Sequence, residues 1–296
     1  MLSYLHGYHA GNAADVLKHS VLAFCLTYLK KKEAPLLCVD THAGAGFYDL
    51  SDGAASQNME WEKGIGLLNP AGERLLSVTG GTPSMISDYL KLAIDFSAHR
   101  QRYSGSPAIM AKLLEKGDRL VCFELHPGEF QTLKTSMTEL REKFLQGPSI
   151  EVRQTDGPAG LKSLLPPPSR RGLVLIDPSW EVQSEFESIP RLSGEGFRRF
   201  PEGTFIIWYP LLAVPKKKFT ASAPVQDILF GLKDRKCCRA ELCTGTAEAS
   251  PRGMYGSGLV IYNPPWTLKP ALEEVLPFLA KLLGDNDGNW RIEWCE

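Results

Sequence analysis

The chain has 296 residues, 43% of them hydrophobic and 23% charged, so it is long enough to bury one large core that carries an insertion. Its net charge of −1 excludes a protein that coats nucleic acid through a general excess of Lys and Arg. No apolar run reaches the roughly 18 to 20 residues of a membrane-spanning helix, and the start of the chain lacks an export pattern, so we expect neither insertion nor export.

The seven cysteines form an odd set without regular spacing, which favours free thiols in a reducing cytoplasm. His6, His9 and His19 with Asp15 lack the paired spacing of zinc motifs, so we expect no metal site.

Apolar residues between Asn12 and Lys32 recur every three to five positions, which predicts the first helix, capped by Asn12 or Asp15. Short apolar runs then alternate with segments of helical period, a pattern typical of an α/β sheet. The runs that we expect to form strands are 36–39, 120–123, 150–152, 173–176, 205–208 and 259–262.

Residues 50–102 interrupt this rhythm, because they are far longer than an ordinary connection and contain helical patterns with few strand signals. We interpret them as a helical insertion after the first strand. The insertion either recognises a macromolecular substrate or is an inert elaboration.

A glycine-rich loop, Asp40-Thr41-His42-Ala43-Gly44-Ala45-Gly46, follows the first strand directly. It lacks the spacing of a dinucleotide fingerprint, which favours a nucleoside without phosphates such as S-adenosylmethionine. Glu124 ends the second strand and could accept both ribose hydroxyls, and Asp156 follows the third strand and could accept from an adenine amine. A tight turn of no function, or a dinucleotide-binding oxidoreductase, remains the alternative.

Two motifs carry a carboxylate or amide before a proline and an aromatic residue: Asp177-Pro178-Ser179-Trp180 and Asn263-Pro264-Pro265-Trp266. An acceptor pair of this kind can bind both N–H groups of an exocyclic amine and free its lone pair from the purine ring. We favour the first motif because Asp177 ends the fourth strand, where the strand order of such a sheet reverses. Asn263 ends the last expected strand, remote from the methyl donor. A simple turn after a buried strand is the alternative for Asp177.

At this point the chain resembles the RlmJ family, bacterial methyltransferases that modify adenine N6 in 23S ribosomal RNA. The residues that carry the resemblance run through most of the chain: Met1-Leu2-Ser3-Tyr4, His6, 9–12, 15–19, 40–46, 105–107, 124–127, 156–157, 170–173, 208–210, 252–254 and 263–266. The resemblance implies a Rossmann-like class I methyltransferase with a seven-stranded, mostly parallel sheet. Its methyltransferase domain would comprise residues 1–49 and 103–296, with 50–102 as the inserted helical subdomain.

The resemblance also implies site residues. The expected cofactor-binding set is Lys18, His19, Asp40, His42, Gly44, Gly46, Ser106, Glu124, Asp156, Gly157 and Asp177. The expected catalytic set is Asp177, Pro178, Trp180, Tyr4 and His6, with no metal. The family usually has a second proline where Ser179 stands, so positioning of the base is the role that this departure puts in question.

We expect the partner to be 23S ribosomal RNA, free or in early assembly, bound by a cytoplasmic monomer. Arg170-Arg171 and Arg198-Arg199 flank the fourth and fifth strands and are candidate phosphate contacts. Tyr4 and Trp180 are expected to stack on the base, whereas Trp208 and Trp266 are interpreted as core residues. The alternatives are a DNA adenine or protein amide as acceptor, and an RNA-binding relative with weakened catalysis.

Overall fold

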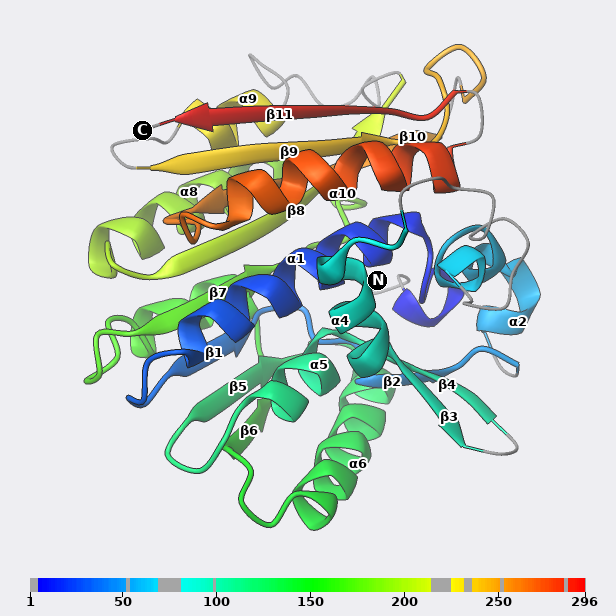
Figure 1. The fold of residues 1–296 in the computed structure, drawn as a ribbon. Coiled ribbons are helices and arrows are strands. Elements are labelled where there is room, and N and C mark those ends of the chain that lie inside the picture. The colour runs from blue at the N-terminus through cyan, green and yellow to red at the C-terminus, as the bar shows by residue number, and fades with distance from the viewer. Residues whose placement is uncertain are drawn as a thin grey trace.

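The computed structural model describes residues 5–51, 54–68, 81–97, 100–213, 225–231, 236–250, 253–284 and 287–295. Its centre is an eight-stranded sheet with the order β11-β9-β10-β8-β7-β1-β5-β6 (Figure 1). β6, β5, β1, β7 and β8 are parallel neighbours, β10 is antiparallel to β8 and β9, and β11 is antiparallel to β9. The strand order reverses between β1 and β7, and in parallel sheets this is where a ligand crevice opens.

All six predicted strands are confirmed. They are β1 (Leu37–Asp40), β5 (Arg119–Phe123), β6 (Ser149–Arg153), β7 (Gly172–Ile176), β8 (Thr204–Leu212) and β10 (Met254–Tyr262). The expected number of seven strands is wrong, because β9 (Cys237–Cys243) and β11 (Asn289–Cys295) raise the count to eight. Asn263 therefore follows an antiparallel strand, which is not the last strand of the chain.

Helices cover both faces of the sheet (Figure 1). One face packs against α1 (Ala13–Lys30), α4 (Ser84–Ala93), α5 (Ser106–Leu113), α6 (Pro127–Lys143) and α10 (Leu268–Leu283). The other face packs against α7 (Gly157–Gly160), η4 (Leu161–Ser163), α8 (Glu185–Arg199) and α9 (Val225–Gly231). Within the described ranges, no helix has the length and apolar character to cross a membrane.

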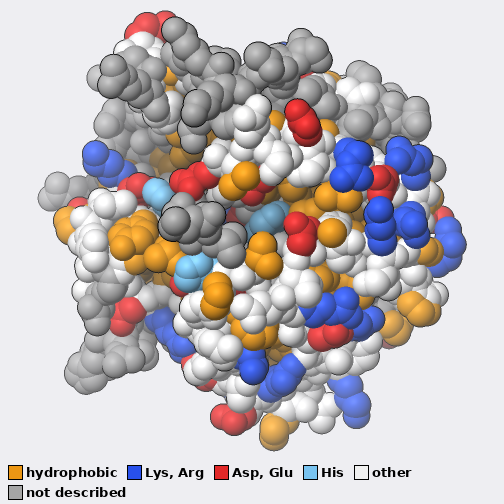
Figure 2. Space-filling model, turned by 180° about the vertical axis from the view of Figure 1, so that it is seen from behind, with side chains coloured by type: hydrophobic (Ala, Val, Ile, Leu, Met, Phe, Trp, Pro, Cys, Tyr) orange, Lys and Arg blue, Asp and Glu red, His pale blue; other side chains and the backbone are white. Residues whose placement is uncertain are grey.

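The two ends of the parallel strands carry different side chains. Arg170-Arg171 precedes β7 and Arg198-Arg199 ends α8 before β8, so both pairs lie where the parallel strands begin, opposite the glycine loop. The Arg171 guanidinium donates to the carbonyl oxygens of Leu29 and Ala34 and so holds the end of α1. In the view of Figure 2, many Lys and Arg side chains gather toward one side of the molecule and the His side chains lie apart from them. The structure thus gives Arg171 a role in the fold, and phosphate contact by the two arginine pairs stays a prediction.

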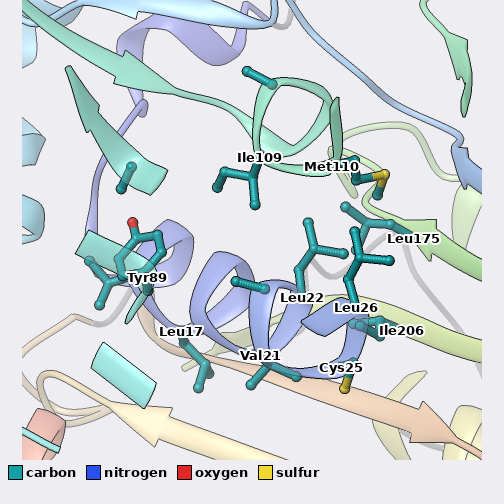
Figure 3. Close-up of a cluster of buried hydrophobic side chains, with 14 of the residues drawn as sticks. Leu17, Val21, Leu22, Cys25, Leu26, Tyr89, Ile109, Met110, Leu175 and Ile206 are labelled. Atoms are coloured by element: carbon teal, nitrogen blue, oxygen red, sulfur yellow. The ribbon is translucent and has the colours of Figure 1, made fainter. Parts of the chain in front are cut away.

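The first helix lies at the centre of one layer. Asn12 caps α1 by accepting from the backbone N–H of Asp15 at 3.0 Å, which confirms the predicted cap. Val21, Leu22 and Leu26 are fully buried between the sheet and the neighbouring helices (Figure 3). Because α1 is buried on nearly all sides, its polar residues near the start are held rigidly inside the molecule.

The region after β1 contains strands as well as helices. Its helices are α2 (Ala55–Asn58), η2 (Glu60–Lys63), η3 (Ile65–Leu68) and α4, and η1 (His6–Tyr8) packs beside α2. β2 (Phe47–Asp49), β4 (Arg100–Ser104) and β3 (Ile94–Ser97) form a separate three-stranded antiparallel sheet. The expected helical insertion therefore also contains strands, because β4 pairs with β2 at its base and β3 pairs with β4. The domain division at residues 50 and 102 stays a prediction.

Candidate active site

Glycine is required at two positions of the loop that follows β1. Gly44 and Gly46 have φ angles of 60° and 83°, in the left-handed region. A Cβ on Gly44 would lie 2.2 Å from the Tyr48 hydroxyl, and one on Gly46 would lie 3.1 Å from the Cβ of Ser136. The backbone N–H of Ala45 donates to the same Tyr48 hydroxyl at 3.0 Å, so the turn is closed by its own neighbour.

A cleft opens beside this loop. Its walls come from the carboxyl ends of β1, β5, β6 and β7 and from the start of the chain. They are formed by His6, Thr41, His42, Gly44, Glu124, Leu125, His126, Glu129, Thr155, Asp156, Gly157, Pro158, Asp177, Ser179 and Glu185. The structure thus brings together seven of the predicted site residues: His6, His42, Gly44, Glu124, Asp156, Gly157 and Asp177.

Glu124 and Asp156 present carboxylates that are already oriented by backbone amides. Glu124 accepts from the N–H groups of Gly44 at 2.8 Å and His126 at 2.7 Å, one on each oxygen. Asp156 caps α7 by accepting from the Ala159 N–H at 2.8 Å. Each carboxylate oxygen has a second lone pair, so both side chains can accept further hydrogen bonds from a ligand.

Asp40 is fully buried beneath the loop. One of its oxygens accepts from the His42 N–H at 3.2 Å, and the other has no partner among the described residues. Burial raises the pKa of Asp40 to about 7, although hydrogen bonds from Ser106 and His42 oppose the shift. A buried carboxylate with one such oxygen is suited to a cationic group nearby. Together with Glu124 and Asp156, it fits S-adenosylmethionine, which carries an ammonium, a sulfonium and a ribose diol.

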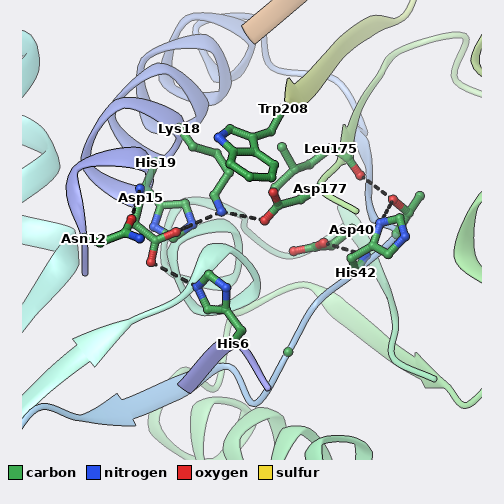
Figure 4. Close-up of polar contacts among 12 residues, drawn as sticks. His6, Asn12, Asp15, Lys18, His19, Asp40, His42, Leu175, Asp177 and Trp208 are labelled. Carbon is green, nitrogen blue, oxygen red and sulfur yellow. Dashed lines mark hydrogen bonds and ion pairs between the residues drawn. The ribbon is translucent and has the colours of Figure 1, made fainter. Parts of the chain in front are cut away.

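A buried network of charges surrounds Asp177 (Figure 4). The Lys18 ammonium lies 2.8 Å from Asp15 and 2.5 Å from Asp177, and His6 binds the other Asp15 oxygen at 3.0 Å. Burial opposes the charge of Lys18, but Asp15 and Asp177 outweigh it and raise the Lys18 pKa. Burial likewise opposes the charge of Asp15, but His6, Lys18 and His19 hold the Asp15 pKa well below its usual range. Lys18 therefore remains a cation between two carboxylates.

A second cleft meets the first at Asp177. Both clefts are lined by His6, Asp177 and Ser179. The remaining wall of the second cleft is formed by His9, Asn12, Ala14, Asp15, Lys18, Trp180, Glu181, Trp208, Pro210, Leu212 and Met254. The Asp177 carboxylate thus faces two adjacent compartments, which suits a reaction between a donor and an acceptor.

The two tryptophans near Asp177 differ in burial and contacts from what the sequence suggested. Trp180 is only 2% exposed, its Nε1 donates to the Trp208 carbonyl oxygen at 3.0 Å, and its ring packs on Phe186 at 5.1 Å. Its ring is therefore not free to stack on a base in this conformation. Trp208 lies beside Lys18 in the second cleft, and its Nε1 has no partner among the described residues. The interpretation of Trp208 as a plain core residue is wrong.

Five of the expected cofactor residues are not among those that line the first cleft: Lys18, His19, Asp40, Gly46 and Ser106. His19 is buried beside Asp15, and its Nδ1 bonds the Tyr103 hydroxyl at 2.7 Å. Ser106 starts α5 and bonds the buried Asp40. Lys18 faces the second cleft and touches the first only through Asp177. Tyr4 lies outside the described residues.

The second motif lies at the end of the sheet where the parallel strands begin, away from the two clefts. The Asn263 amide donates to the carbonyl oxygens of Pro201 and Gly203, which precede β8. Trp266 is 76% exposed there, so its interpretation as a core residue is wrong. The choice of Asp177 over Asn263 agrees with this geometry, because Asp177 alone of the two lines the clefts.

Sequence reasoning missed several residues of the site. Asp15 was considered as a helix cap and as a metal ligand and belongs to the family block 15–19, but its link between His6 and Lys18 was not foreseen. His126, in the family block 124–127, was given no role, and Glu185 belongs to no motif, yet both line the first cleft. The available signals were weak: Asp15 and Lys18 are three residues apart on one helix, and Glu185 begins the helix after the Asp177 motif.

Comparison with known proteins finds relatives that match nearly the whole chain. A family model described as "Ribosomal RNA large subunit methyltransferase D, RlmJ" matches residues 33–296. The chain is 38% identical to Ribosomal RNA large subunit methyltransferase J of Haemophilus influenzae and 35% identical to that of Escherichia coli, in each case over 99% of both chains. It is also similar to the crystal structure of protein LPL1258 from Legionella pneumophila. That match has a TM-score of 0.79 and 31% identity, and covers 96% of this chain and 98% of the other.

Proposed function

This chain belongs to the RlmJ family of ribosomal RNA large subunit methyltransferases, and we propose that it transfers the methyl group of S-adenosylmethionine to N6 of an adenine in 23S ribosomal RNA. One observation carries the assignment of the reacting centre. The first cleft, which the predicted cofactor residues line, and the second cleft meet at the carboxylate of Asp177.

The residues of the first cleft, together with the buried Asp40 of the adjoining loop, have the groups that the cofactor requires. We assign the ribose hydroxyls to Glu124, the adenine amine to Asp156 and the ammonium to the region of Asp40, with Gly44 allowing close approach of the backbone. The bound cofactor supplies an electrophilic methyl group. The protein's part is to hold it beside Asp177 and to exclude water.

Asp177 and Pro178 act on the amine of the acceptor. The carboxylate and the Pro178 carbonyl accept the two N–H groups, which draws the nitrogen lone pair out of conjugation with the ring. Lys18 binds one Asp177 oxygen at 2.5 Å and so fixes the direction of the other. His6 stands where the two clefts meet, placed there by its bond to Asp15, and we assign to it and Tyr4 the closing of the site.

The acceptor base enters the second cleft. Trp208 offers a half-buried aromatic ring there, so we assign base stacking to Trp208 in place of Trp180. The Asp177 side chain is 10% exposed, so an adenine must leave its stack to reach it. Free RNA, or RNA in early assembly, extrudes a base at lower cost than folded ribosomal RNA. We therefore propose such RNA as the substrate, bound by a monomer in the cytoplasm.

The test is transfer of label from S-adenosylmethionine to unmodified 23S RNA fragments, followed by nucleoside analysis for N6-methyladenosine. Asp177→Ala should abolish transfer while cofactor binding is retained. Label on DNA or on ribosomal protein instead of RNA would replace the proposed acceptor. RNA binding without any transfer would leave an RNA-binding relative with weakened catalysis.

A further inference from the structure

The loop after Asp177 wraps around one carboxylate. Glu185, the first residue of α8, accepts from the Ser179 hydroxyl at 3.3 Å and from the Val182 N–H at 3.5 Å. Burial raises the pKa of Glu185, and the backbone N–H groups of Val182, Trp180 and Glu181 with the Ser179 hydroxyl oppose the shift. The Ser179 hydroxyl in turn accepts from the Glu181 N–H at 3.3 Å. Several donors of one short loop therefore converge on Glu185.

The same loop contains a strained backbone. Trp180 has a φ of 55°, in the left-handed region, which a bulky side chain adopts only when its surroundings impose it. The Trp208 carbonyl oxygen holds the ring of Trp180. The backbone amides of Trp180 and of the two residues after it are aimed at Glu185.

Ser179 makes this restraint necessary. A proline at that position would confine Pro178 to an extended conformation and fix the direction of its carbonyl oxygen. Serine imposes no such limit, so the carbonyl direction depends on what holds residues 179–182. The Glu185 carboxylate is the described group that bonds to both the side chain and the backbone of this segment.

We propose that Glu185 is a positioning residue for methyl transfer: through Ser179 and the following amides it holds the Pro178 carbonyl in the direction that a second proline would otherwise impose. The inference rests on the proposed function of Asp177 and Pro178. It assigns to Glu185 no contact with either substrate.

The experiment measures Glu185→Ala in two backgrounds, the natural chain and Ser179→Pro. In the natural chain we expect kcat for RNA methylation to fall by about tenfold to a hundredfold, as a small misplacement of a reacting group does. The Kd for S-adenosylmethionine should change little. In the Ser179→Pro background the same substitution should cost much less in kcat, because proline restrains Pro178 independently.

Glu187→Ala is the matched control, since Glu187 is an exposed acid one position beyond Phe186 on the same helix. It should leave kcat unchanged in both backgrounds. Glu185→Gln keeps an acceptor and the side-chain volume, so it should recover part of the lost kcat and serves if Glu185→Ala unfolds.

An equal loss of kcat in the two backgrounds would overturn the proposal. So would a weakened Kd for S-adenosylmethionine that accounts for the loss, since Glu185 would then be a cofactor ligand. If the natural chain methylates no adenine at all, the proposed function fails first, and that result is distinguishable because it appears before any substitution is made.

Discussion

The ammonium of Lys18 lies 2.5 Å from the carboxylate of Asp177, although the two residues are 159 positions apart and their side chains are 3% and 10% exposed. A second carboxylate, Asp15, binds the same ammonium at 2.8 Å from the preceding turn of α1. The catalytic loop and the first helix are thus joined by one buried cation. The network couples the stability of the fold to the geometry of the site.

Lys18→Met should therefore impair both the stability of the fold and the transfer of the methyl group. It removes the cation and leaves the Asp15 and Asp177 carboxylates buried side by side, which we expect to lower the free energy of unfolding by about 3–5 kcal/mol. Methyl transfer should fall strongly because Asp177 loses its fixed orientation. Denaturant unfolding and labelled-methyl transfer check the two effects. Lys91→Met is the control, because its pair with Asp88 is exposed and such pairs contribute about 0–1 kcal/mol. Equal stability of the two variants would contradict the account.

Trp208→Ala should weaken the binding of the RNA substrate and leave the binding of the cofactor unchanged. Stacking of a base on an aromatic ring contributes about 1–3 kcal/mol, so we expect kcat/KM for RNA to fall by about tenfold to a hundredfold. Trp208→Phe should keep most of the activity. Trp266→Ala offers a matched control at the opposite edge, where the ring is 76% exposed. A loss of S-adenosylmethionine affinity in Trp208→Ala would instead place the ring against the cofactor.

The sequence predicted the parallel strands well for a physical reason. Strands buried on both faces consist of uninterrupted apolar residues, as in β7, so they stand out from their flanks. β9 was missed because Arg239 and Glu241 interrupt its pattern, although both are buried by ion pairs and a hydrogen bond with distant residues. β11 was missed because it is an edge strand that begins with exposed residues.

The site was predictable to the extent that its residues stand next to strand ends. Asp40, Glu124 and Asp177 could be found in this way, since the carboxyl ends of neighbouring strands meet at one edge. The link from Asp15 through Lys18 to Asp177 depends on how α1 crosses the sheet, which no local pattern encodes. The burial of Trp180 depends on its left-handed backbone and on the Trp208 carbonyl, which are properties of the folded loop.

His19 should make stability depend on pH. Burial lowers its pKa to about 3, below the ordinary value of 6.5, so the folded state stays neutral while the unfolded state binds a proton. The stability present above about pH 6.5 is therefore lost progressively as the pH falls toward 3. Between about pH 7 and pH 5 the loss from this group is about 2 kcal/mol.

Unfolding of His19→Gln at these two pH values checks this account, because the variant should lose less stability on acidification than the natural chain does. Tyr103→Phe removes the hydroxyl partner but keeps the imidazole, so it should retain the pH dependence. An unchanged slope in His19→Gln would assign the acid sensitivity to other groups.

Asp40 should make the affinity for the cofactor depend on pH near and below pH 7. Its pKa of about 7 means that a large share of the unliganded protein carries a neutral Asp40 below neutrality. A cationic ligand group beside it favours the carboxylate, so binding must release a proton there, and affinity should fall by up to about tenfold per pH unit below the pKa. The ammonium of the ligand, an α-amine with a pKa of about 7.7–8.0, stays largely protonated over this range.

Calorimetry at about pH 6 and pH 7, in buffers of different ionisation enthalpy, measures both the affinity for the cofactor and the number of protons released on binding. Asp40→Asn should bind more weakly at pH 7 and lose the proton release. Release that persists in Asp40→Asn would show that another group in the cleft titrates on binding, and the cation would then have to be assigned elsewhere.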